Sequence, residues 1–139
     1  MSEEPEVVRE QRGNVLILRI NRPAARNALN GEVMGGLGAG FAEAESNPDV
    51  RPVVLTGAGD KFFCIGGRKD GMEDTILYAG TLPTLEMYEA IDRLQKPVIA
   101  SVNGFAVGGG NVLQMVCDMT IAKESAVFRQ VGPMMGSFD

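Results

Sequence analysis

The stretch V-I-A-S-V-N-G-F-A-V-G-G-G-N-V, from Val98 to Val112, decides the fold. Its apolar run at 98–102, which is rich in β-branched residues, predicts a buried strand. Asn103-Gly104 predicts a turn that ends this strand. A second apolar patch follows, and three glycines then open the segment Asn111–Cys117, which we expect to be a helix. The pattern therefore predicts a strand, a turn and a glycine-rich entry into a helix.

These three glycines, at 108–110, predict a site for negative charge. Without Cβ atoms the backbone can reach positive φ, and a ligand can approach closely. The first N–H groups of a helix lack intrahelical partners, and the helix dipole adds partial positive charge. A phosphate fits poorly, because neither the spacing G-x-G-x-x-G nor a Lys-Ser/Thr pair after the glycines is present. A carbonyl oxygen that becomes an oxyanion fits better; a plain tight turn is the alternative.

Composition limits the functions that are open to the chain. Its 139 residues suit one domain, and its net charge of −5 argues against a nucleic-acid partner. No apolar run reaches the roughly 20 residues that span a bilayer. The acidic start M-S-E-E-P-E lacks the basic region of a signal peptide. We therefore expect a cytoplasmic protein without a membrane partner.

Histidine is absent from the sequence. This removes the commonest general base and the commonest metal ligand, so we expect no metal site. Cys64 and Cys117 lie in apolar surroundings, which favours reduced core residues over a disulfide. Any catalysis must therefore use carboxylates, hydroxyls, lysine, tyrosine or backbone donors.

The rest of the chain alternates predicted strands and helices. A helix capped by Asn30 and ending near Asn47 carries four glycines that each cost about 1 kcal/mol relative to alanine, so packing must hold it. A second helix is marked by apolar residues between Leu85 and Leu94, and 68–80 is predicted to be a mobile loop. Further strands are expected at 7–11, 15–20, 52–56, 119–122 and 126–128. This order predicts an α/β fold with a mostly parallel sheet.

Two glycine groups follow predicted strands of this sheet. Gly66-Gly67 comes after the strand at 52–56, and the glycines at 108–110 come after the strand at 98–102. Ligands of open α/β sheets bind beyond the carboxyl ends of the strands. Two backbone donors from two strand ends could therefore bind one oxygen.

Several motifs together resemble the crotonase superfamily, also called the enoyl-CoA hydratase/isomerase family. They are N-R-P and N-A-L within 21–29, F-C-I-G-G at 63–67, K-P at 96–97, N-G-F-A-V-G-G-G at 103–110 and C-D at 117–118. The resemblance implies a ββα spiral core, a coenzyme A thioester as substrate, and a homotrimer or homohexamer. Because such proteins are about twice as long, 1–139 would be a truncated core domain without the C-terminal helical region.

The same resemblance implies roles for particular residues. The N–H groups of Gly67 and Gly109 would polarise the thioester carbonyl and stabilise an enolate. Backbone carbonyls near Cys64 and Gly66 would contact the adenine side of coenzyme A. Arg26 matches a position that contacts a coenzyme A phosphate, although a lone arginine is often only a solvated charge. Coenzyme A would enter as part of the substrate, with no permanently bound cofactor.

One departure from the family concerns its two glutamates, whose positions hold Val112 and Gly132. A hydratase needs carboxylates to orient and deprotonate water, and valine and glycine cannot do this. The segment at 128–139, F-R-Q-V-G-P-M-M-G-S-F-D, instead resembles 1,4-dihydroxy-2-naphthoyl-CoA synthase and 2-ketocyclohexanecarboxyl-CoA hydrolase. Those enzymes make or break a carbon–carbon bond beside a thioester.

That closer similarity implies further site residues. Ser137 and Asp139 would form a polar and acid/base pair, while Gln130 and Gly132 would match positions that hold a bicarbonate. A simple turn at Gly-Ser-Phe-Asp is the alternative. Arg68 stands where these synthases have Asp, and we expect it to face an anionic substrate group or a coenzyme A phosphate.

Three functions are therefore open. The leading one is an acyl-CoA enzyme that stabilises an enolate for ring-forming or ring-opening carbon–carbon chemistry. The second is an enoyl-CoA hydratase or isomerase of fatty-acid or aromatic-acid degradation, with carboxylates recruited from elsewhere, such as Asp74 or Glu86. The third is a non-catalytic acyl-CoA binding protein.

Overall fold

The computed structural model describes residues 4–67 and 83–130. Its elements run in the order β1 (Val7–Arg12), β2 (Val15–Ile20), the short 3-10 helix η1 (Pro23–Ala25), α1 (Gly31–Ser46), β3 (Val53–Gly57), β4 (Phe62–Cys64), α2 (Pro83–Arg93), β5 (Val98–Val102), β6 (Phe105–Val107), α3 (Gly109–Met115), β7 (Met119–Ala122) and β8 (Val127–Arg129). Within these ranges, no helix is long and apolar enough to cross a membrane.

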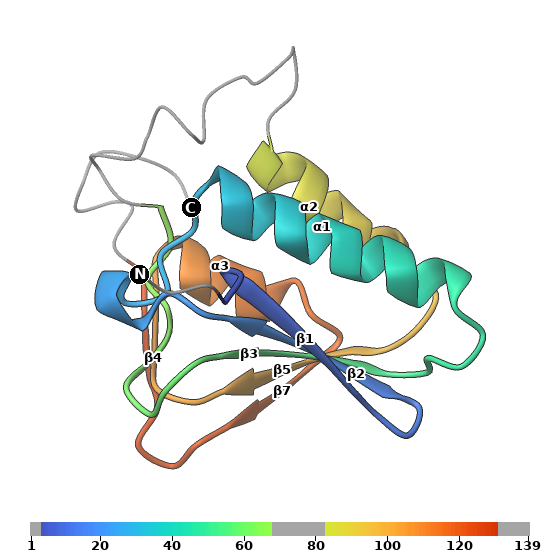
Figure 1. The fold of residues 1–139 in the computed structure, drawn as a ribbon. Helices are drawn as coiled ribbons and strands as arrows, with labels where there is room; N and C mark the ends of the chain where they lie inside the picture. The colour runs from blue at the N-terminus through green and yellow to red at the C-terminus, as the bar shows by residue number, and fades with distance from the viewer. Residues whose placement is uncertain (1–3, 68–82, 131–139) are drawn as a thin grey trace.

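The larger sheet has five strands in the order β1-β2-β3-β5-β7. The hairpin β1–β2 is antiparallel, and the other neighbours are parallel. Buried and partly exposed residues alternate along β2, β3 and β5, so one face of the sheet is buried. Figure 1 shows α1 and α2 lying side by side over this sheet. The expected parallel α/β core is confirmed.

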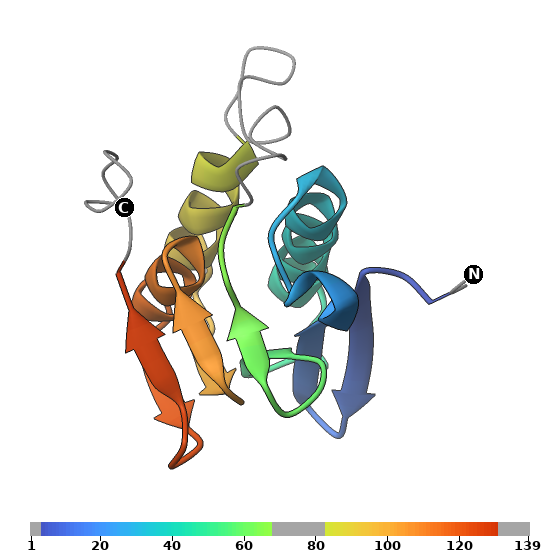
Figure 2. The ribbon, with the colours of Figure 1, turned by 90° about the vertical axis from the view of Figure 1, so that its left-hand side faces the viewer.

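A second sheet contains the three short parallel strands β4, β6 and β8 (Figure 2, green, orange and red). Each follows directly on a strand of the larger sheet, β3, β5 and β7. Helices α2 and α3 come after β4 and β6. The chain therefore repeats a ββα unit, as the expected crotonase-like spiral requires.

Two parts of the sequence-based topology were wrong. The strands β4 and β6 were not predicted as separate elements, and the two glycine groups follow these strands rather than β3 and β5. Each strand has three residues, which is too short for a period-2 pattern to emerge. Helix α3 begins at Gly109, not at Asn111, because the last two of the three glycines form its first turn.

Helix α1 buries its apolar side chains at the predicted spacing. The side-chain oxygen of Asn30 accepts a hydrogen bond from the Val33 amide at 2.8 Å, so the expected N-cap is confirmed. In α2, Met87 and Ile91 are buried, whereas Leu85 is exposed. The core side chains of α1 are Val33, Met34, Leu37, Phe41 and Ala44.

The glycines of α1 fall into two groups. A Cβ on Gly36 would lie 2.8 Å from a methyl group of Val7, and one on Gly40 would lie 2.6 Å from both methyl groups of Leu18. Gly35 and Gly38 face open space within 4 Å. Two of the four glycines therefore let the helix approach the sheet, while the other two make no such contact.

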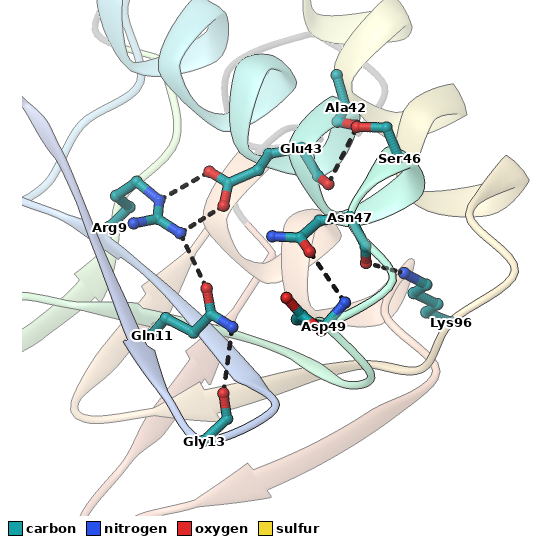
Figure 3. A network of polar contacts seen from close by, with 9 residues as sticks. All are labelled: Arg9, Gln11, Gly13, Ala42, Glu43, Ser46, Asn47, Asp49 and Lys96. Atoms are coloured by element: carbon teal, nitrogen blue, oxygen red, sulfur yellow. Dashed lines mark hydrogen bonds and ion pairs between the residues drawn. The ribbon is translucent and has the colours of Figure 1, made fainter.

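Polar contacts fix the C-terminal half of α1 (Figure 3). The Arg9 guanidinium on β1 pairs with the Glu43 carboxylate, with Nε at 2.7 Å. The ammonium of Lys96 donates to the carbonyl oxygens of Ala44 and Asn47, the latter at 2.8 Å. These carbonyls lie at the helix end, where intrahelical donors run out. Lys96 therefore caps α1 from the chain that leads into β5.

Both cysteines are free, with Cys64 buried and Cys117 half-buried. Burial raises the pKa of each thiol to about 12 from an ordinary value of 9.0, because a buried thiolate would lose its hydration. For Cys117 the neighbouring Asp118 carboxylate adds to the increase in pKa. Both groups are therefore neutral thiols at physiological pH.

The two groups of α1 glycines should respond oppositely to alanine. Gly35→Ala adds a methyl group in open space, so we expect the free energy of unfolding to rise by about 1 kcal/mol. Gly40→Ala gains the same helix propensity but overpacks buried Leu18, which costs about 1–3 kcal/mol. Urea unfolding of both variants measures the difference. Equal stabilisation by the two substitutions would contradict the close approach at Gly40.

Stability should fall in alkaline solution because of the two thiols. From about pH 9 the unfolded thiols lose their protons, while the folded thiols keep theirs until about pH 12. The unfolded state then binds fewer protons, so each thiol lowers the free energy of unfolding by about 1.4 kcal/mol per pH unit. Below the unfolded pKa this contribution to stability is fully present. Urea titrations between about pH 9 and pH 11 measure the slope.

The control is the variant in which Cys64 and Cys117 are both replaced by alanine. Its slope over the same pH range should be shallower, whatever its absolute stability. An unchanged slope would assign the alkaline loss of stability to other groups.

Candidate active site

Two glycine segments from distant parts of the sequence meet where the strands of the smaller sheet end. A Cβ on Gly66 would lie 2.6 Å from the Gly109 nitrogen, and a Cβ on Gly110 would lie 1.9 Å from the Cys64 carbonyl oxygen. No side chain fits at either position. A Cβ on Gly109 would lie 3.7 Å from the Gly67 nitrogen, so the structure brings these two predicted residues together.

Backbone nitrogens at the start of α3 lie at this junction, since a Cβ on Gly66 would be 2.6 Å from that of Gly109 and 3.3 Å from that of Gly110. The Gly108 amide donates to the Arg129 carbonyl at 2.8 Å, and the Val112 amide donates back to the Gly108 carbonyl at 3.0 Å. By helix geometry, the three amides between them, at 109–111, have no partner within the helix. An electron-rich oxygen placed here could accept hydrogen bonds from such amides.

The Gly66-Gly67 segment is held by a neighbouring loop. The Leu29 amide donates to the Gly66 carbonyl at 2.9 Å, and Leu29 forms a parallel bridge with Gly67. Gly66 has a φ of +78°, and its amide donates to the Cys64 sulfur at 3.4 Å. The bond from Leu29 uses the carbonyl of Gly66, so it does not consume the Gly67 amide.

Two asparagines hold the strand that leads into this segment. Asn27 and Asn103 both donate side-chain N–H groups to the Phe62 carbonyl, at 2.7 and 3.0 Å. In the sequence, both residues belong to recognised motifs, and Asn103 was expected in a turn, but neither was assigned to the site. Their positions beside turn residues, N-A-L and N-G, carried no sign that both would reach one carbonyl 35 and 41 residues away.

Tyr88 is a further residue that the sequence analysis did not assign to the site. Its phenol on α2 donates to the Gly109 carbonyl at 3.3 Å. In the sequence, Tyr88 lies within the apolar pattern between Leu85 and Leu94 that predicts a helix, and nothing there points to the site. The contact ties α2 to the first turn of α3.

Side-chain amides line one side of α3. The Gln114 side chain accepts from the Thr120 hydroxyl at 2.7 Å and donates to Asn111 at 2.9 Å. Asn111 in turn donates to the Gln130 side-chain oxygen at 2.9 Å. Gln130, predicted to hold an anion, thus lies exposed at the end of a chain of oriented hydrogen bonds that begins at Thr120.

Arg26 lies exposed at the end of η1, with a left-handed φ of 57°. Its guanidinium carbon is 5.8 Å from the centre of the Phe62 ring, a cation–π distance. The charge is therefore accessible to solvent and oriented beside β4. A phosphate group could reach it there.

Cys64 lies at the site, but its thiol is not a nucleophile. The side chain is fully buried, and its pKa near 12 keeps it protonated. In residues 4–67 and 83–130, no three His, Cys, Asp or Glu side chains are placed to hold a metal ion.

The remaining candidates divide between described and undescribed parts of the chain. Val112, at the expected glutamate position, is half-buried on α3. Arg68, Gly132, Ser137 and Asp139 lie outside the described residues.

The fold and the sequence are both similar to those of known proteins. The family model for enoyl-CoA hydratase/isomerase matches residues 10–139. The structure is similar to that of EchA1_1 from Mycobacterium paratuberculosis, with a TM-score of 0.86 and 40% sequence identity. It is also similar to an enoyl-CoA hydratase from Mycobacterium tuberculosis (TM-score 0.86, 32% identity) and to a putative enoyl-CoA hydratase/isomerase from Acinetobacter baumannii (0.84, 34%).

In each case the match covers 96% of this chain but only 52%, 52% and 55% of the solved chain. The chain therefore spans about half the length of these relatives. The ββα spiral, the glycine junction and the family match agree, and the chain belongs to the enoyl-CoA hydratase/isomerase family, the crotonase superfamily.

Proposed function

We propose that this protein binds an acyl-CoA thioester and stabilises its enolate with the backbone amides of Gly67 and Gly109. The observation that carries this proposal is the glycine junction, where a Cβ on Gly66 would lie 2.6 Å from the Gly109 nitrogen. Backbone segments this close can offer donors to one small oxygen. The family assignment supports a coenzyme A thioester as the source of that oxygen.

The chemical gain follows from charge development. Removing a proton beside a thioester places negative charge on the carbonyl oxygen, and fixed donors bind this charge more strongly than they bind the neutral carbonyl. One such donor is worth about 2.7–4 kcal/mol in the transition state. The donors are backbone groups, so this step needs neither histidine nor metal.

Coenzyme A binding is proposed at the edge of this junction. The accessible guanidinium of Arg26 supports contact with a phosphate group. The Gly66 carbonyl already accepts the Leu29 amide and keeps one lone pair for the adenine side, with the Cys64 carbonyl proposed beside it. We also propose that Arg68 faces an anionic group of the substrate or of coenzyme A.

For the reaction itself we propose carbon–carbon bond formation or cleavage beside the thioester. Val112 supports this choice, since an apolar side chain at that position cannot activate water. Ser137 and Asp139 are the proposed polar and acid/base pair. Gln130, oriented through Asn111, is proposed with Gly132 to hold a bicarbonate that would act as base.

Hydration or isomerisation of an enoyl-CoA is the second candidate. The solved structures from M. paratuberculosis and M. tuberculosis are named EchA1_1 and enoyl-CoA hydratase, and this chain is 40% and 32% identical to them. A carboxylate would then have to come from elsewhere. Glu86 lies exposed in the first turn of α2, and Asp74 lies outside the described residues.

Assembly into a homotrimer or homohexamer and a cytoplasmic location are part of the proposal. Exposed apolar side chains on three consecutive elements support an assembly that covers them. They are Met115 on α3, Met119 and Ile121 on β7, and Phe128 on β8.

Gly66→Ala tests the junction, with Gly59→Ala as its matched control. Both glycines have positive φ, +78° and +87°, but only a Cβ on Gly66 meets other atoms within 4 Å. We expect Gly66→Ala to weaken or abolish the red shift of a cinnamoyl-type chromophoric acyl-CoA, which reports carbonyl polarisation. Turnover should drop by about 10²–10³. Gly59→Ala should lower the free energy of unfolding through backbone strain and leave the absorbance shift unchanged.

Two results would defeat the proposed function. One is a wild-type protein that neither binds the chromophoric thioester nor shifts its absorbance. The other is a folded Gly66→Ala variant with an undiminished shift. Binding and polarisation without turnover of any enoyl or β-keto thioester would instead assign the non-catalytic role.

Val112→Glu combined with Gly132→Glu separates the two reaction classes. If the carboxylates of hydration are absent from the native site, the double variant should gain hydration of an unsaturated acyl-CoA by at least about tenfold, since general acid–base groups contribute about 10²–10⁴ in rate. The absorbance of the conjugated thioester measures this reaction. If the wild type hydrates this substrate strongly and the variant does so at the same rate, the result would instead support the second candidate, an enoyl-CoA hydratase.

A further inference from the structure

We propose that Asn27 is a positioning residue, which holds the Gly66-Gly67 segment against α3 through the carbonyl of Phe62. The consequence for substrate rests on the proposed function, whereas the positioning itself does not. In the part of the chain that the structure describes, Asn27 is the buried polar residue, with 0% exposure. Burying a polar side chain costs free energy unless hydrogen bonds within the protein replace those that it made to water.

The hydrogen bonds of Asn27 show what it holds. Its side-chain nitrogen donates to the carbonyls of Phe62 at 2.7 Å and Ala58 at 3.1 Å, and its side-chain oxygen accepts from the Arg22 amide at 2.9 Å. Both amide protons are therefore used within the protein. The side chain is directed at backbone and is not available to bind a ligand.

The Phe62 carbonyl needs this support because the strand is irregular there. The register between β4 and β6 shifts between Phe62 and Cys64, as in a β-bulge. A bulge interrupts the ladder locally, so fewer ladder bonds hold this part of the strand. Asn27 and Asn103 supply two side-chain donors to the Phe62 carbonyl in addition to the shifted ladder.

A second hydrogen bond, from the same loop, couples the position of Phe62 to that of the glycines. Asn27 and Leu29 belong to one loop, and they hold Phe62 and Gly66 on the facing segment, the latter through the Leu29 amide at 2.9 Å. The two bonds bracket residues 63–65, of which Phe63 and Cys64 have 0% exposure. A displacement at Asn27 must therefore move Gly66 and the Gly67 amide that follows it.

The backbone at Asn27 explains why this residue type suits the position. Its φ is 56°, in the left-handed region that asparagine, aspartate and glycine tolerate. Gly57 leaves the room for its amide, because a Cβ there would lie 2.8 Å from the Asn27 nitrogen. Asn27→Asp and Asn27→Gly thus remove the donors without forcing a new backbone conformation.

The first measurement needs no ligand. We expect Asn27→Asp and Asn27→Gly to raise the hydrogen-exchange rate of the Leu29 amide at least about tenfold more than that of the Ala100 amide in β5, because the loop loses its hold on β4. In the aspartate variant a carboxylate faces two carbonyl oxygens, so its effect should be at least as large. Both measurements use the full 139-residue chain.

The second measurement tests whether the position of the Gly66-Gly67 segment affects polarisation of the thioester carbonyl. With the chromophoric acyl-CoA, both Asn27 variants should show a smaller absorbance shift and about tenfold weaker binding. Lys96→Met is the matched control, since it removes two hydrogen bonds to carbonyls at the opposite end of α1. It should lower stability, raise the exchange of Leu29 and Ala100 equally, and leave the absorbance shift unchanged.

Folded Asn27 variants with wild-type exchange at Leu29 and a full absorbance shift would overturn the inference. If neither variant folds, Asn103→Asp removes the other donor to the Phe62 carbonyl from a less buried position. It must then raise Leu29 exchange selectively, and an unchanged rate would again overturn the inference. A wild type that fails to bind the thioester defeats the proposed function alone, because exchange at Leu29 still tests the positioning.

Discussion

The close approach of Gly66 to Gly109 and of Cys64 to Gly110 is the contact on which the candidate site depends. A Cβ at Gly66 or Gly110 would lie 2.6 Å from the Gly109 nitrogen or 1.9 Å from the Cys64 oxygen. Both distances are shorter than any tolerable contact, so any larger residue would force the end of β4 away from α3. The site is therefore a property of two backbones, and its donors cannot be lost by a change of side-chain rotamer.

That approach requires the chain to leave the larger sheet twice in the same direction. At Gly57 and Gly104 the chain passes from β3 to β4 and from β5 to β6, and a Cβ at either glycine would lie within 2.5 Å of a backbone oxygen. Because β4 and β6 pair in parallel, both short strands end at the same edge of the smaller sheet. The spiral repeat thus carries two glycine groups, more than 40 residues apart in sequence, to one place.

The long elements could be predicted from the sequence because their signals are local. The β2 strand is a run of six residues of which five are apolar, and α1 has an asparagine cap with apolar residues at helical spacing. Strands β4 and β6 could not, because three residues carry no period and their pairing is non-local. The two glycine groups were expected to share one oxygen, and the structure brings them together, although on other strands than predicted.

The roles of Asn27 and Tyr88 could not be predicted from the sequence, for a different reason. A buried asparagine and a turn asparagine look alike in sequence, and only the fold places the Asn27 amide 2.7 Å from the Phe62 carbonyl. Likewise, the phenol of Tyr88 meets the Gly109 carbonyl only because the fold brings this part of α2 within hydrogen-bond distance of the first turn of α3. Residues that act through another residue's backbone leave no spacing pattern, whereas glycines that must approach closely do.

The division of the site into backbone donors and side-chain acids also explains how one fold can support several reactions. Donors at Gly67 and Gly109 would stabilise an enolate whichever bond forms next, since the charge develops on the same oxygen. The proton transfers that select the reaction would belong to side chains placed around that oxygen. At the first such position this chain has Val112, whose apolar side chain would bring no negative charge to the proposed enolate. The proposed carbon–carbon chemistry then requires only that an acid or base be supplied from the segment that follows Gln130.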